Sequence, residues 1–160
     1  MKLKKVLTVM LSAVLLLALT ACGSKEAWYI ESYDWELTLI QSGEDGSVIG
    51  CGSEHYEAHK EIEGLIVADL VCTADGGNFT ITDQTNNKNY HGNYEVAEES
   101  SKSTIYSITT TENTGTAVVS YTEHDDGTKT PTLIITIGDY SLNFQSELDL
   151  TDMKKNTKTH

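Results

Sequence analysis

The stretch TLIITIGDYSLNFQ, residues 132–145, decides the fold class, because polar and apolar side chains alternate along both of its halves. In 132–137, Leu133, Ile135 and Ile137 fall on one side of an extended chain. The turn formers Gly138-Asp139 separate this half from 140–145, which alternates in the same way. The pattern predicts two antiparallel strands with one buried face and one face toward solvent.

Similar β-branched, alternating runs fill most of the chain before this hairpin, and turns rich in Gly, Asn and Asp separate them. They predict an all-β domain over 28–150, an antiparallel up-and-down barrel of about eight strands, with a β-sandwich as the alternative. Residues 47–51 could add a short strand, and 53–64 could form a short helix or a charged loop. The predicted strands are 28–41, 65–74, 78–83, 90–97, 104–111, 116–124, 132–137 and 140–145.

The N-terminal end has the layout of an export signal. Lysines within 2–5 precede an apolar run at 6–19, which is shorter than a bilayer-spanning helix. The run ends in Leu19-Thr20-Ala21-Cys22, which resembles the lipobox of bacterial prolipoproteins. The resemblance implies that residues 1–21 are removed as a signal peptide and that Cys22 carries a lipid. An uncut membrane anchor is the alternative.

A lipid on Cys22 would hold the mature chain at the extracytoplasmic face of the cell membrane. Two acyl chains suffice for stable anchoring, whereas one chain alone is marginal. Residues 22–27 would form a short tether, because five residues after Cys22 span at most about 17 Å when extended. Residues 151–160 are polar and carry three lysines, so we expect a flexible tail.

The charge balance excludes several classes of partner. The 160 residues include 24 acidic and 11 basic ones, all lysine, for a formal net charge of −13. Loss of the three lysines in 1–21 would leave eight basic residues and a net charge of −16. Nucleic-acid binding requires cationic groups against phosphates, so we expect none. Without arginine, bidentate capture of phosphate or carboxylate by a guanidinium is excluded.

With Cys22 lipidated, Cys51 and Cys72 remain, and two cysteines in an exported domain usually pair. We therefore predict a Cys51–Cys72 disulfide. The alternative is two separate buried thiols, because the sequence does not show that their Cα atoms come within bonding range.

No motif predicts catalysis, a metal or a cofactor. His55 and His59 are four residues apart, but the zinc-protease pattern H-E-x-x-H is missing, so a solvated loop is favoured. The run from Asp83 imitates a calcium loop, but Lys88 stands where glycine is needed and Tyr94 where a glutamate should close the loop. We interpret it as a hairpin turn and predict that the protein is not an enzyme.

The layout is similar to small lipocalin-like lipoproteins of bacteria. The residues that carry the likeness are Trp35, the segment KNYHGNY at 88–94, and the closing segments at 126–127, 132–135 and 139–144. The resemblance implies a β-barrel whose function, in many such families, is unassigned.

Aromatic side chains could line a pocket in such a barrel or fill its core as ordinary packing. The pocket candidates are Trp35, Tyr94, Tyr106 and Tyr121, from a wider set that includes Tyr33, Tyr90 and Tyr140. The predicted function is a non-enzymatic module that binds a small, partly apolar ligand. One alternative is an interaction module with a filled barrel, whose acidic surface meets an envelope protein. A metal-dependent enzyme is the remaining alternative.

Overall fold

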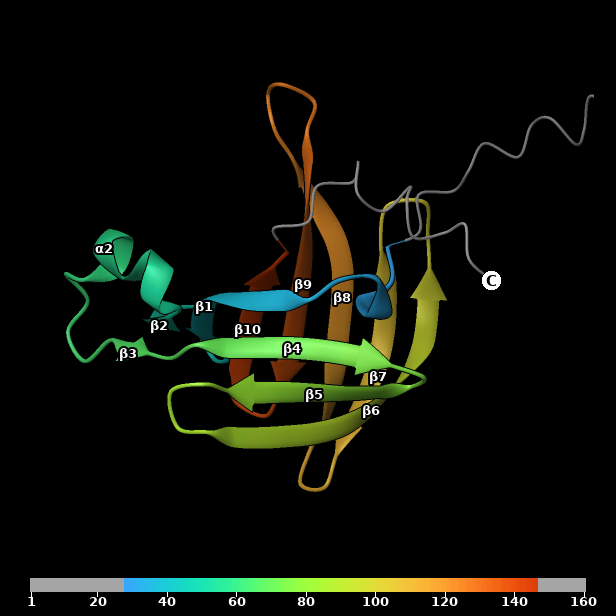
Figure 1. Cartoon of the computed structure of the whole chain (residues 1–160), viewed down its shortest axis with the longest axis horizontal. Helices are drawn as coiled ribbons and strands as arrows, with labels where there is room; N and C mark the ends of the chain where they lie inside the picture. The colour runs from blue at the N-terminus through green and yellow to red at the C-terminus, as the bar shows by residue number, and fades with distance from the viewer. Residues whose placement is uncertain (1–27, 147–160) are drawn as a thin grey trace, which may run out of the picture.

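The computed structural model describes residues 28–146, so the predicted signal peptide, the predicted lipid attachment at Cys22, and the predicted tether and tail lie outside the described residues. Strands dominate this part of the chain (Figure 1). Its elements are η1 (Ile30–Ser32), β1 (Trp35–Ser42), β2 (Val48–Cys51), η2 (Ser53–His55), α2 (Tyr56–His59), β3 (Ile66–Val67), β4 (Leu70–Asp75), β5 (Asn78–Asp83), β6 (Lys88–Glu99), β7 (Thr104–Thr110), β8 (Thr114–Glu123), β9 (Lys129–Ile137) and β10 (Tyr140–Gln145).

Eight strands close into a barrel. From β4 to β10 each strand pairs with the next in sequence, and β1 joins the two ends by pairing with both β4 and β10. All of these pairings are antiparallel. The prediction of an all-β, antiparallel up-and-down barrel is confirmed, and the architecture is consistent with the lipocalin-like barrel that the resemblance implies.

The remaining strands form an appendage outside the barrel. β2 pairs with the second half of β1, on the edge that β4 uses at its first half, and β3 runs parallel to β2. Residues 53–59, for which helix and loop were alternatives, form one turn of 3-10 helix and one turn of α-helix. No helix within residues 28–146 is long and apolar enough to cross a membrane.

The alternation in residues 132–145 determines which of their side chains lie in the core. Leu133, Ile135 and Phe144 are buried, whereas Ile134 and Gln145 face outward and are exposed. In β1 the alternation breaks, because a bulge between Leu37 and Leu39 shifts the register against β10. Ile40 therefore takes the inward place that the simple pattern gives to Leu39.

Two predicted strands are shorter than their sequence runs. The run at 28–41 becomes a strand only at Trp35, and residues 28–34 instead form an irregular segment with the single turn η1. The run at 65–74 divides into β3 and β4. The runs at 78–83 and 140–145 coincide with β5 and β10.

Candidate functional site

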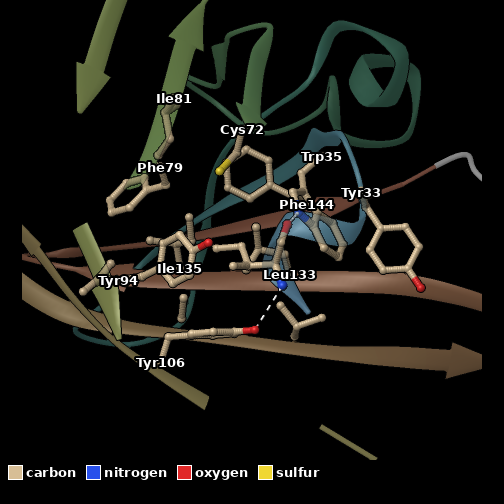
Figure 2. Close-up of a cluster of buried hydrophobic side chains, with 14 of the residues drawn as sticks. Tyr33, Trp35, Cys72, Phe79, Ile81, Tyr94, Tyr106, Leu133, Ile135 and Phe144 are labelled. Atoms are coloured by element: carbon tan, nitrogen blue, oxygen red, sulfur yellow. Dashed lines mark hydrogen bonds between the residues drawn. The ribbon is translucent and has the colours of Figure 1, made fainter. Parts of the chain in front are cut away.

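Residues 28–34 lie over one end of the barrel, which we call the plugged end. Trp28 and Ile30 are buried there, at 2% and 0% exposure. The Ile30 N–H donates to the Tyr106 hydroxyl at 3.1 Å, the dashed line in Figure 2. The Trp35 indole N–H donates to the Ile30 carbonyl at 2.7 Å, and the Tyr94 hydroxyl donates to the Glu31 carboxylate at 2.6 Å.

The same contacts decide the role of the predicted pocket residues. Trp35, Tyr94 and Tyr106 are 0%, 8% and 1% exposed and belong to one packed cluster (Figure 2). Tyr94 and Tyr106 meet edge to face, with ring centroids 5.4 Å apart. Their polar atoms hold residues 30 and 31 in place. These three side chains therefore fill the barrel as core, which corrects their assignment to a ligand pocket.

Tyr121, the fourth candidate, lies at the rim of the plugged end. Its ring packs on Trp28 at 4.5 Å between centroids, and the Lys129 ammonium lies 4.5 Å from its centre. Both contacts close the plugged end rather than open a cavity. The sequence places all four aromatics in the same barrel but does not show that residues 28–34 bond to the polar atoms of Trp35, Tyr94 and Tyr106.

A cleft of about 520 Å³ lies on the outer wall. It opens where β4 and β2 part from the shared edge of β1, between Glu36 and Leu39. Two lining residues of this cleft are hydrogen-bonded to each other, because the Asp69 carboxylate accepts the Ser53 N–H at 3.0 Å. Glu36, Glu54 and Asp69 make the lining acidic, and none of the lining residues is a lysine.

A second hollow, of about 350 Å³, lies beside Gly92 of β6. The Phe79 ring lies so close to Gly92 that a Cβ there would fall 2.4 Å from two ring atoms. None of the four pocket candidates lines this hollow or the acidic cleft.

The barrel end opposite the plugged end is less tightly covered, and we call it the open end. Tyr90 pairs with buried Ile81 and Tyr140 with Ile137, so both tyrosines project to the inner side of the barrel. They are nevertheless 51% and 52% exposed. The strand register places them on the same side as the core tyrosines Tyr94 and Tyr106, and their exposure distinguishes them from that core.

The predicted Cys51–Cys72 disulfide is not formed, since both cysteines are buried free thiols. Cys72 lies opposite Trp35 and Cys51 opposite Leu39, on the same edge of β1. Four residues along a strand separate their positions by roughly 10–13 Å, beyond the about 7 Å limit for the Cα atoms of a disulfide. Burial raises the pKa of both thiols, that of Cys72 from 9.0 to about 12.

This pKa predicts a loss of stability at high pH. The raised folded-state pKa of Cys72 means that, between about pH 9 and pH 12, the unfolded chain loses a proton that the folded chain keeps. Stability should therefore fall as pH rises through this window. We expect urea unfolding between about pH 8 and pH 10.5 to show a smaller loss in Cys72→Ala than in the parent. Equal losses would contradict a protonated Cys72 in the folded state.

The remaining motifs have structural roles. The Asp83 carboxylate accepts the Asn86 N–H and its side-chain amide, both at 2.9 Å, and Asp83 pairs with Lys88 across the turn. The predicted hairpin turn is therefore confirmed. His55 and His59 lie in η2 and α2, and within residues 28–146 no group of three His, Cys, Asp or Glu side chains is placed to hold a metal ion.

Comparisons with protein-family models, with curated proteins and with solved structures found no match to this chain.

Proposed function

We propose that the protein is an exported lipoprotein whose barrel is a non-enzymatic interaction module. The observation that carries the proposal is the use of the interior: the aromatic side chains that could have lined a pocket are packed and bonded to residues 28–34. A barrel filled in this way offers its outer surface for recognition. Both hollows described above lie on that surface.

The lipobox supports an anchor at Cys22. If the chain is anchored there, the fold indicates which end of the barrel would lie nearer the membrane. Trp28 lies at the plugged end, packed on Tyr121. A tether of five residues spans at most about 17 Å, so the plugged end would face the membrane. The open end, with Tyr90 and Tyr140, would then face away from the membrane and be accessible to envelope partners.

The anchor is tested by replacing its only acceptor. We expect the parent chain to incorporate radiolabelled palmitate and to fractionate with membranes, and Cys22→Ser to lose both properties. Cys51→Ser, which changes a buried thiol at the end of β2, is the matched control and should retain the label. Label in Cys22→Ser, or a mature protein that starts elsewhere, would overturn the anchor.

The interaction role is tested by crosslinking in cells with an amine-reactive reagent. The expected result is one discrete adduct with an envelope protein, which mass spectrometry identifies. A chain that stays monomeric and uncrosslinked in the envelope would contradict the role.

A second candidate function is binding of a small, partly apolar ligand at the open end. The half-exposed rings of Tyr90 and Tyr140 favour it, because an amphipathic ring suits a ligand with apolar and polar parts. A thermal-shift screen against lipids tests it. A hit should shift the parent and leave Tyr140→Ser unshifted, and a screen without hits would remove this candidate.

A further inference from the structure

Strand β6 extends beyond its neighbour β7, which leaves part of its edge unpaired. Residues 88–91 pair with β5, whereas the pairing with β7 begins only at Gly92, opposite Thr110. In Figure 1 the first half of β6 runs across the lower part of the molecule, below β5. All four side chains at 88–91 are exposed. We call residues 88–91 the open edge.

The register shows which backbone groups point away from β5. The Tyr94 N–H donates to the Gly77 carbonyl at 2.8 Å, in the turn that leads into β5. The N–H and C=O groups of successive residues point to opposite edges of a strand, so Tyr90 and Gly92 also turn theirs toward β5. Asn89 and His91 therefore present theirs at the open edge. No strand of the described chain pairs with them there.

The second hollow lies where β7 ends and the open edge begins. His91 and Gly92 line one side of it and Thr109–Thr111 the other. No lysine or carboxylate lines it, although the chain carries a net charge of −13. Two of its lining side chains, Thr80 on β5 and His91 on β6, are hydrogen-bonded across the strands at 3.1 Å. A strand placed beside the open edge would continue the line of β7 and reach this hollow with one end.

We propose that the open edge binds an extended peptide of a partner protein by adding it as a strand next to β6. The inference rests on the proposed interaction function and names its surface and partner type. Unpaired N–H and C=O groups at strand spacing form a template for pairing with another strand. Tyr90, 51% exposed and on the inner side, favours an apolar side chain opposite it.

Two other arrangements fit less well. The free edge of β3 is two residues long, too short to align a strand. A second copy of this chain would bring together two bodies of the same strong negative charge, whereas a neutral peptide meets an uncharged hollow. The surface therefore selects a heterologous segment with alternating polar and apolar residues.

The test uses the full-length chain in detergent and a phage-displayed library of random linear peptides. Selected peptides should alternate polar and apolar residues. A bound peptide should slow hydrogen exchange of the Asn89 and His91 amides by about tenfold or more, since a factor of ten corresponds to about 1.4 kcal/mol. Asn89→Pro should abolish binding, because proline removes the N–H and obstructs the edge without breaking a bond to β5. Asn89→Ala, which keeps the N–H, should bind normally.

Tyr90→Ser should weaken binding while leaving the backbone edge intact, which keeps the test informative if Asn89→Pro unfolds. Peptides that bind Asn89→Pro and Tyr90→Ser as well as the parent, or no selection of peptides at all, would overturn the inference. In cells, an adduct that persists in Asn89→Pro would overturn strand addition but leave the interaction role standing. Absence of any adduct from the parent would contradict the role itself.

Discussion

Replacement of Trp35 by alanine is expected to lower the free energy of unfolding by about 3–5 kcal/mol, the usual cost of truncating a buried tryptophan. Trp35 is 0% exposed, and its ring lies 5.0 Å from that of Tyr33. Its strand closes the barrel, because β1 joins β4 to β10. Truncation would leave a cavity and would also remove the donor to the Ile30 carbonyl that helps hold the plugged end.

Urea denaturation followed by circular dichroism measures this loss. Glu36→Ala is the matched control, because Glu36 is the next residue of β1 and faces solvent. Its effect should stay within about 0.5 kcal/mol, as for most surface substitutions. A loss below about 1 kcal/mol in Trp35→Ala would mean that the interior is not packed as described, and the ligand-pocket hypothesis would regain support.

The barrel follows from local pattern to a large extent. Alternation within single strands is a local property, so β5 and β10 are predicted to the residue and the inward places of Leu133, Ile135 and Phe144 follow from it. Antiparallel neighbours need only short turns, so strands adjacent in sequence become neighbours in the barrel. The number of barrel strands and the class of fold are therefore accessible from composition and spacing.

The features that matter for function depend on contacts between distant residues. Residues 28–34 have the composition of a strand, but the Tyr106 hydroxyl, 76 residues from Ile30 in sequence, helps hold them across the barrel end. Cys51 and Cys72 look like a pair in sequence, yet they align with positions of β1 that are four residues apart. Spacing along the sequence gives neither the distance between Ile30 and Tyr106 nor the distance between the two cysteines. The sequence therefore predicts a pocket where the structure has packed core, and a disulfide where it has two free thiols.

The open edge was missed for a related reason. The sequence predicts a strand at 90–97, whereas β6 spans Lys88–Glu99 and outruns β7. This unpaired edge exists because β6 is longer than its neighbour β7. Predicting it requires the exact ends of both strands, and a pattern of alternating residues does not define strand ends. Gly92 was the available signal, because a glycine inside a strand often marks a bend or a close approach.

Gly115→Ala is expected to destabilise the barrel by about 1–3 kcal/mol, the usual cost of overpacking. A Cβ at Gly115 would fall 2.2 Å from the Thr136 carbonyl oxygen and 3.1 Å from the Ile137 Cα. Both are backbone atoms of β9, which is paired along its whole length with β8, so neither can withdraw without breaking the ladder.

The entropy of the unfolded chain opposes this destabilisation. Alanine restricts the unfolded chain and, where its conformation fits, stabilises a protein by about 0.4–1 kcal/mol relative to glycine. Because the clash is with backbone, the strain should exceed this gain, and the midpoint of urea unfolding should fall. Thr116→Ala, at the adjacent exposed position, is the control and should change little. A Gly115→Ala variant as stable as the parent would contradict the close approach of β8 and β9 at this position.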